Sequence, residues 1–361
     1  MSERKPRFGL WAPYRGQWVV PPAGLADNPA RWDFSKAVVQ SADRVGFDSV
    51  LFAQHTINPG GQEREILEPW TASAAAAAVT KNIEIIAAIK PRLYHPVVLA
   101  KLALGIEDIS EGRFALNVVN AWFIPELEKS GIGFPEHDER YAYGREWIQV
   151  VRDLIEGKTV NFEGKYFNVR DYNLKPASLY RDRPYIYAGG ESETARDYAV
   201  DFADNWLING RPLEDTKELV ASVSGRSRQG RALDFGTTGF VATRATDAAA
   251  EEYLESLYDL QGIPDQLAAQ IRLTKVDPKA QTIHYAKKYG ETRRIGANGG
   301  VLPGFVGSYD RVARRFADFY EAGVTTFLLS FFPHIEEQEL FASEIIPRVH
   351  ALTGTKQLVV A

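Results

Sequence analysis

The stretch FDSVLFAQH, residues 47–55, indicates the fold of this chain. Its apolar centre, residues 50–52, is typical of a buried strand, and the polar pair Gln54 and His55 follows where such a strand would end. The same order recurs along the chain: an apolar run, a polar or glycine-rich corner, then a helical stretch. In a βα barrel the carboxyl ends of the strands meet at one mouth, and the polar residues there carry the chemistry.

Eight short, apolar segments rich in β-forming residues predict strands, and helical stretches alternate with them. The strands are Phe8–Ala12, Phe47–Ala53, Ile83–Ile89, Phe114–Val119, Pro184–Ala188, Trp206–Ile208, Gly236–Thr243 and Thr326–Ser330. The helices are Phe34–Val45, Trp70–Val79, Val97–Ile109, Tyr141–Ile155, Ser192–Phe202, Leu213–Val223, Tyr309–Glu321 and Glu336–Leu352. This alternation predicts an α/β fold, a single (β/α)8 TIM barrel with insertions over residues 1–361. A doubly wound open sheet is the alternative, but eight alternations of strand and helix fit that architecture less well.

Three segments do not belong to a minimal (β/α)8 barrel. Residues 160–167 predict a hairpin around a Glu-Gly-Lys turn. Residues 11–33 form a long first loop rich in Pro and Gly. Residues 258–304 form an insertion that contains a glycine cluster with Arg294 beside it. Long loops in compact domains are lids, binding loops or disordered segments, and we expect a lid at 258–304.

The composition is ordinary for a globular protein and excludes several kinds of site. The chain has 361 residues, of which 45% are hydrophobic, and a dispersed net charge of −5. This charge gives no basic stripe for nucleic acid and no polybasic membrane anchor. The chain has no cysteine, so disulfides, thiolate metal sites and cysteine nucleophiles are excluded. Because no signal peptide or membrane span is visible, we expect a cytoplasmic protein.

Polar residues at the ends of predicted strands are the candidates for chemistry. His55 suits proton transfer because the unperturbed pKa of histidine lies near neutrality, although a structural histidine is commoner. The other histidines show no metal-ligand spacing, so no metal site is expected. Asn117 would interrupt a buried strand, where its amide needs a hydrogen-bonding partner. That partner is either a ligand such as a flavin ring or a side chain on a neighbouring strand.

Two further motifs suit a phosphate group. Arg140, in the segment HDERY at 137–141, can bind a phosphate through two hydrogen bonds, or it can pair with a carboxylate. Gly189 and Gly190 join a predicted strand to a helix that begins near Ser192. There the backbone can approach a ligand closely, and the helix offers free N–H groups. Glycine is also common at such turns for steric reasons alone.

The segment FFPHIEE at 331–337 follows the last predicted strand. Its aromatic residues are expected at the barrel mouth, with His334 near the start of the last helix. Its two glutamates more often complement a helix dipole than act in catalysis.

Taken together and in this order, these segments resemble the bacterial-luciferase-like flavin monooxygenases. The most similar branch is that of the two-component enzymes acting on alkanesulfonates, dimethylsulfone or pyrimidines. The resemblance extends over nearly the whole chain. It rests on the segments DRVGFD (43–48), SEGRFALNVV (110–119), HDERY (137–141), FEGKYF (162–167), AGGES (188–192), FVGS (305–308) and FPHIEE (332–337).

The resemblance implies that a separate NAD(P)H-dependent FMN reductase supplies reduced FMN (FMNH2), which then reacts with O2. The implied cofactor contacts are Gln54, His55, Asn117, Glu126, Arg140, Tyr141 and Ser192, and the glycine corner described above adds Gly190. In this scheme Arg140, Tyr141 and Ser192 hold the phosphate, and Asn117 faces the isoalloxazine ring. The residues expected to act in catalysis are His55, Arg294 and His334.

The expected substrate is a small organosulfur compound, a sulfone or an alkanesulfonate. Alkanesulfonate-type members carry a Trp after the sixth strand and an Arg-x-His pair on the seventh. This chain has Asn209, Thr238 and Phe240 at the matching positions, so a cation that suits a sulfonate is lost. Arg293 or Arg294 in the predicted lid could still meet an anion. The residues expected to line the substrate pocket are Trp11, Trp70, Trp122, Asn209 and Phe332.

The sequence leaves three other functions open. One is the oxygenation of a pyrimidine-like or other small organic substrate. Another is a coenzyme F420-dependent dehydrogenase, which shares this barrel in related families and would consume no O2. The third is a flavin-binding accessory barrel that has lost its activity. By family analogy, we also expect a homodimer or homotetramer.

Overall fold

Eight parallel strands close into a barrel in the order β1-β12-β9-β8-β7-β4-β3-β2. The computed structural model describes residues 5–19, 29–223, 226, 232–261, 288, 295–296 and 298–355. The barrel strands are β1 (Arg7–Trp11), β2 (Ser49–Phe52), β3 (Glu84–Ile89), β4 (Phe114–Val118), β7 (Tyr185–Gly189), β8 (Asn205–Ile208), β9 (Asp234–Phe240) and β12 (Val324–Ser330). Each of the eight predicted strands has a counterpart, and the (β/α)8 barrel is confirmed.

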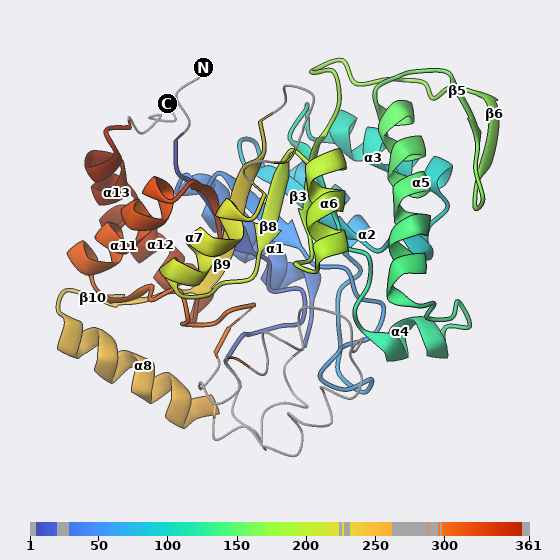
Figure 1. Ribbon diagram of the computed structural model, residues 1–361. Helices are drawn as coiled ribbons and strands as arrows, with labels where there is room; N and C mark the ends of the chain where they lie inside the picture. Colours follow the sequence, from blue (N-terminus) through green and yellow to red (C-terminus); the bar gives the residue numbers. More distant parts are fainter. Residues whose placement is uncertain are drawn as a thin grey trace.

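Helices surround the barrel and add a few elements beyond the minimal fold (Figure 1). The helices of the main series are α1 (Trp32–Arg44), α2 (Pro69–Val79), α3 (Pro96–Ile109), α5 (His137–Ile155), α6 (Glu193–Phe202), α7 (Leu213–Ala221), α11 (Tyr309–Glu321), α12 (His334–Glu344) and α13 (Ile346–Thr353). The additional elements are η2 (Pro91–Leu93), α4 (Ile124–Lys129), α8 (Asp247–Gln261), β5 (Val160–Glu163), β6 (Asn168–Tyr172), β10 (Ala242–Arg244) and β11 (Val306–Ser308).

Two predicted elements are divided in the structure. The strand expected over 236–243 leaves the barrel after Phe240, whose N–H donates to the carbonyl of Gly300 at 2.7 Å. The continuation, β10, pairs with β11 outside the barrel. The helix expected over 336–352 is two helices, α12 and α13, because Pro347 lies in the first turn of α13 and has no N–H to continue α12.

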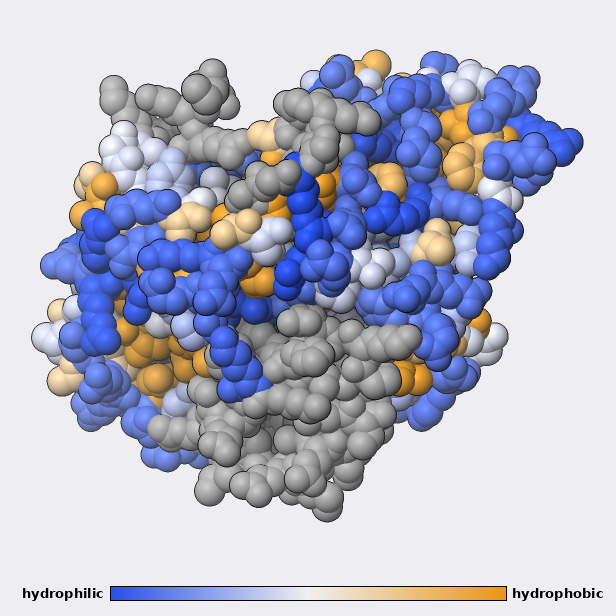
Figure 2. Space-filling model, in the orientation of Figure 1, coloured by the Kyte–Doolittle hydropathy of each residue, from blue (hydrophilic) through white to orange (hydrophobic). Residues whose placement is uncertain are grey.

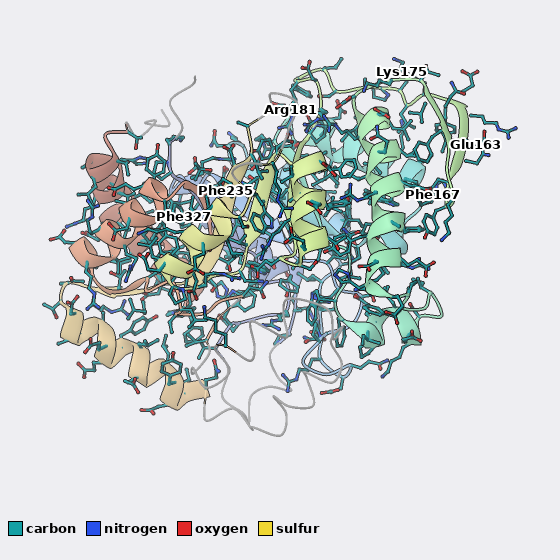
Figure 3. The ribbon with its side chains drawn as sticks, viewed as in Figure 1. Glu163, Phe167, Lys175, Arg181, Phe235 and Phe327 are labelled. Carbon is teal, nitrogen blue, oxygen red and sulfur yellow. The ribbon has the colours of Figure 1, made fainter. Side chains whose placement is uncertain are left out.

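The predicted hairpin at 160–167 is confirmed, with β5 and β6 antiparallel. Glu163 and Phe167 mark it in Figure 3, on the outside of the barrel beside α5. It is attached there by Glu146 of α5, whose carboxylate accepts the backbone N–H groups of Lys165 at 2.9 Å and Tyr166 at 2.8 Å.

Alternate residues of each strand face opposite sides of the barrel wall, as the period of two requires. On β4, for example, Phe114, Leu116 and Val118 join the large core between strands and helices. Ala115 joins a smaller cluster inside the barrel, and Asn117 shares its side of the strand. A polar residue at an inward position near the carboxyl end of a strand therefore lies at the mouth of the barrel.

The amino-terminal end of the barrel is filled by a buried polar group. Arg7 forms an ion pair with Glu84 at 2.8 Å, and the hydroxyl of Tyr187 donates to the same carboxylate at 2.9 Å. Burial, followed by the neighbouring Glu84 carboxylate, raises the pKa of Tyr187, so its hydroxyl remains a donor. These side chains close one end of the barrel and leave the carboxyl end for a ligand.

Trp70 belongs to the outer core, and its predicted place in a substrate pocket stays a prediction. It begins α2, is 4% exposed and packs edge-on against Phe114 at a ring distance of 5.5 Å. Its indole N–H donates to the backbone carbonyl of Ala88 at 3.1 Å. These contacts place the ring between α2 and the outer side of the barrel wall.

The predicted lid at 258–304 lies mostly outside the described residues. At its start, 258–261 complete α8. At its end, 298–304 form turns that contact the ends of β8 and β9, where the hydroxyl of Thr238 donates to the carbonyl of Asn298. Arg294 also lies outside the described residues, so its predicted role and the lid itself stay predictions.

The face drawn in Figure 2 is largely hydrophilic, with apolar side chains in separate patches. No helix in the described part of the chain is both long and apolar enough to cross a lipid bilayer.

The two positions Trp70 and Trp122 test this division between core and mouth. Replacing Trp70 by Ala should lower the free energy of unfolding by about 3–5 kcal/mol, because it empties a closed core. Trp122→Ala should lower the free energy of unfolding by clearly less, because the Trp122 ring is half-buried. Urea denaturation of both variants measures the difference, and equal losses would contradict the assignment.

Candidate active site

The carboxyl ends of neighbouring strands bring together most of the predicted site residues. Gln54 and His55 follow β2, Asn117 lies near the end of β4, and Gly189 ends β7. Because β4 pairs with both β3 and β7, these ends are adjacent around the mouth. The arrangement follows from the parallel barrel, which collects strand ends from distant parts of the sequence.

Asn117 has the features of a ligand-binding amide. It is 4% exposed, and no described residue hydrogen-bonds to its Oδ1. The nearby Gly189 leaves space: a Cβ there would lie 4.0 Å from Asn117 Oδ1 and only 3.2 Å from Val119. Gln54 is likewise buried, with both amide atoms unbonded among the described residues. Buried polar atoms of this kind are costly unless a ligand or water satisfies them.

Ser192, Tyr141 and Gly190 meet at the start of α6. Ser192 caps this helix by accepting the N–H of Ala195 at 3.2 Å, and its Oγ lies 3.1 Å from His137 Nε2. The rings of His137 and Tyr141 lie 4.9 Å apart. Gly190 has a φ of +108°, and a Cβ on it would lie 2.9 Å from the Tyr141 hydroxyl. Hydroxyl groups, an imidazole and a helix amino terminus therefore surround one small region, which suits an anion.

His137 was not singled out as a site residue from the sequence. It is four residues before Tyr141 on α5 and thus on the same face of the helix, which is the signal that could have found it.

Arg140 has structural bonds within the predicted phosphate-binding segment. Its Nε donates to the carbonyl of Asn120 at 3.2 Å and its Nη1 to the carbonyl of Pro135 at 2.7 Å. The guanidinium also lies over the ring of Phe134, 4.1 Å from the centroid. These contacts fix the approach to α5, and a phosphate contact of Arg140 stays a prediction.

A buried charged group lies beside His55. Lys90, directly after β3, lies 3.0 Å from His55 Nδ1 and forms an ion pair with Glu126 of α4. Glu126 also accepts the N–H of Thr56 at 2.6 Å. Glu126 was predicted as a cofactor contact, whereas the structure shows its carboxylate engaged by Lys90 and Thr56.

The protonation of this group follows from its burial. Burial lowers the pKa of Lys90 to about 8, a shift that the ion pair with Glu126 opposes. Lys90 therefore stays largely protonated at neutral pH. Burial, then the Lys90 charge and Arg15, hold the pKa of His55 well below its usual range. His55 is accordingly a neutral imidazole.

Lys90 was missed in the sequence, although it follows the apolar run of residues 85–89 as directly as Gln54 follows its own strand. The same strand-end argument that selected Gln54 and His55 applies to it.

A second buried ion pair, also missed, lies across the ends of β7 and β8. Glu191 is 2% exposed, binds Arg211, and accepts the backbone N–H of Asn209 at 2.7 Å. It thereby fixes the chain that carries Asn209, a predicted pocket residue. In the described part of the chain, no group of three or more His, Asp or Glu is placed to hold a metal ion.

The remaining predicted pocket residues occupy different surroundings. Trp11 joins the cluster inside the barrel, and Trp122 packs edge-on against His55 at 5.5 Å. Phe332 packs with the cluster that contains Phe240 and Ile295, next to β9.

His334, predicted to be catalytic, is 2% exposed and packs against Phe34 at a ring distance of 5.4 Å. Its Nδ1 lies 3.0 Å from the side-chain oxygen of Gln17. Burial lowers its pKa to about 3, so it is neutral at physiological pH. These contacts give it a packing role, and its catalytic role stays a prediction.

Solved structures of similar fold cover nearly the whole chain. Riboflavin lyase (RcaE), solved with modified FMN and riboflavin, has a TM-score of 0.80 at 18% identity, over 99% of this chain and 94% of its own. Long-chain alkane monooxygenase (LadA) has a TM-score of 0.79 at 21% identity, over 100% and 94%. An F420-dependent secondary alcohol dehydrogenase, solved with an F420-acetone adduct, has a TM-score of 0.68 at 18% identity, over 96% and 99%.

These similarities establish the fold, and the sequence establishes the family. The family model described as luciferase-like monooxygenase matches residues 7–326, which include the eight strands except the end of β12. The broad resemblance expected from the sequence motifs is confirmed. The chain belongs to the luciferase-like monooxygenase family.

Proposed function

We propose that this protein is a monooxygenase that uses reduced FMN and O2. The observation that carries the proposal is the buried amide of Asn117, whose Oδ1 no described residue hydrogen-bonds, beside the open backbone of Gly189. An isoalloxazine ring offers the N–H and C=O groups that such an amide requires. When bound, reduced FMN supplies the electrons that activate O2, while the protein binds, orients and shields the reactants.

The residues fit an elongated cofactor with a polar ring at one end and an anion at the other. Asn117 and Gln54 would hold the ring. Ser192 and Tyr141 would hold the phosphate at the positive end of the α6 dipole. Gly190 would lie between these two ends. Because it has no Cβ, which would crowd the Tyr141 hydroxyl, its backbone stays accessible to the cofactor.

The alternative cofactor, coenzyme F420, is bound as an adduct with acetone in the secondary alcohol dehydrogenase of similar fold. Reduced FMN is favoured here because the family is described as monooxygenases. An F420-dependent dehydrogenase would transfer hydride without consuming O2, so oxygen uptake separates the two functions.

A small neutral organosulfur compound, such as a sulfone, is the substrate we favour. Lys90 and Arg211, the cations that follow β3 and β8, each bind a carboxylate. The hydroxyl of Thr238, where alkanesulfonate-type members carry a cation, bonds instead to backbone groups of Gly210 and Asn298. An alkanesulfonate would meet little unbalanced positive charge among these residues.

The proposal includes a partner and a setting. A separate NAD(P)H-dependent FMN reductase would supply FMNH2, the enzyme would act in the cytoplasm, and it would assemble as a homodimer or homotetramer.

Replacing Asn117 by Leu tests the ring site. The variant should weaken binding of reduced FMN at least about tenfold, because it removes hydrogen bonds to the ring. Its stability should be unchanged or higher, because the lost Oδ1 has no partner in the described protein. Anaerobic fluorescence titration and urea denaturation measure both quantities.

The matched control is Asn205→Leu. Asn205 is also buried in the barrel and bonds to Thr326 at 3.3 Å, on the amino-terminal side. This variant should lose stability and keep the affinity for FMN. If Asn117→Leu bound FMN normally, the assigned ring site would be wrong.

The phosphate end predicts a preference for FMN over riboflavin. Ser192→Ala should reduce this preference about tenfold, since it removes one hydroxyl contact to a charged group. It should also cost about 1 kcal/mol of stability through loss of the helix cap. Ser192→Thr, which keeps a hydroxyl, should retain most of the preference. If the ratio of the riboflavin Kd to the FMN Kd were the same in the unaltered protein and in both variants, the phosphate would not bind at Ser192.

Oxygen consumption tests the reaction itself. With a flavin reductase and NADH, we expect substrate-dependent O2 uptake with sulfones, and less with alkanesulfonates, pyrimidines or alkanes. Product analysis by mass spectrometry should show one added oxygen atom. Hydride transfer from reduced F420 without O2 uptake would replace this proposal by the dehydrogenase function.

A further inference from the structure

Lys90, Glu126 and His55 form a closed polar group at the mouth of the barrel. They come from three places in the sequence, after β3, on α4 and after β2, and are 2%, 1% and 6% exposed. Lys90 Nζ lies 3.0 Å from His55 Nδ1 and bonds to Glu126 Oε2. Glu126 Oε1 is held in turn by the N–H of Thr56 at 2.6 Å.

The chemistry of the ammonium group fixes the proton on His55. A lysine ammonium has three donors and no acceptor, so the nitrogen facing it must accept. His55 Nδ1 therefore carries no proton, and the ring proton of the neutral imidazole is on Nε2. Among the described residues, none hydrogen-bonds to this second nitrogen.

Aromatic contacts fix the plane of the His55 ring. Trp122 packs against it edge-on at 5.5 Å and Phe123 at 6.2 Å. Neither ring offers a carbonyl or hydroxyl oxygen to the Nε2 proton. His55 is therefore held both in orientation and in tautomer, with one donor left for a ligand.

We propose that Lys90 is a positioning residue that locks His55 as the Nε2–H tautomer, so that His55 donates a hydrogen bond to an oxygen atom of the bound reactants. In this arrangement His55 cannot take up a proton at Nδ1 while Lys90 is charged. The assignment of the tautomer depends only on contacts within the protein. The identity of the acceptor, a sulfonyl oxygen of the substrate or a carbonyl of the flavin, rests on the proposed function.

The charged groups that act on His55 agree with this assignment. They are Lys90, Glu126 and Arg15, from three elements around the ring. The two cations disfavour a charged imidazole. Glu126 Oε1 lies 3.8 Å from His55 Nδ1 and would attract a proton to that nitrogen if Lys90 were absent. The lysine thus determines which nitrogen of His55 is protonated.

Nitrogen-15 NMR of protein with labelled histidine tests the tautomer directly. Long-range proton couplings near neutral pH should show His55 Nδ1 unprotonated and Nε2 protonated, with the His55 signals assigned by comparison with His55→Gln. No flavin or substrate is needed. A protonated Nδ1 in the unaltered protein would overturn the inference, whether or not FMN binds.

The variant Lys90→Met tests the positioning role. We expect His55 Nδ1 to become protonated toward Glu126, and kcat to fall about 100-fold, as for loss of one preorganised donor. FMN should still bind, with a Kd changed by less than about tenfold even if the flavin is the acceptor, which a general loss of structure would not allow. The control, Lys217→Met, removes an exposed lysine on α7 and should change none of these quantities.

Removal of Lys90 leaves Glu126 buried without its partner, which can prevent folding. The double variant Lys90→Met/Glu126→Gln removes both charges and avoids this. It should show a mixture of His55 tautomers and a reduced kcat. Unchanged kcat in either folded variant would contradict the positioning role, while absent FMN binding in the unaltered protein would contradict only the proposed function.

Discussion

The alternation of side chains along eight closed parallel strands is the constraint on which the rest of this structure depends. Every second residue must enter a narrow interior, and the two ends of that interior are chemically different. The amino-terminal end is filled by Arg7, Glu84 and Tyr187, which satisfy one another. The carboxyl end presents the small or polar residues Asn117 and Gly189. In the described part of the barrel, this is the end that offers a ligand both space and hydrogen-bonding groups.

Buried ion pairs organise this mouth by joining segments that follow different strands. Lys90 after β3 holds Glu126 on α4, and Glu191 after β7 holds Arg211 after β8. Such pairs contribute little net stability, because removing two charges from water costs about as much as their attraction returns. Their effect here is geometric: the first places His55, and the second fixes the backbone of Asn209.

The sequence was sufficient where one strand or one turn carried the signal. Apolar runs located the eight strands, and a polar interruption and a glycine corner selected Asn117 and Gly190, which lie on β4 and directly after the adjacent strand β7. Prediction from the sequence failed where the role of a residue depended on partners distant in the chain. The strand-end position of Lys90 was visible in the sequence, but its ion pair with Glu126, 36 residues later, was not. Trp70 was expected in the pocket, whereas its packing against Phe114 became visible only in the structure.

The neutral state of His55 has a consequence for selectivity. Lys90 and Glu126 cancel in charge, and His55 adds a donor without adding a positive charge. A donor of this kind stabilises an uncharged oxygen acceptor, but it gives no long-range attraction to an anion, whose desolvation would then be uncompensated. A sulfone and a sulfonate both present sulfonyl oxygens, yet only the sulfonate carries a charge. Under the proposed function, the Lys90–Glu126–His55 group taken by itself would favour the sulfone over the sulfonate.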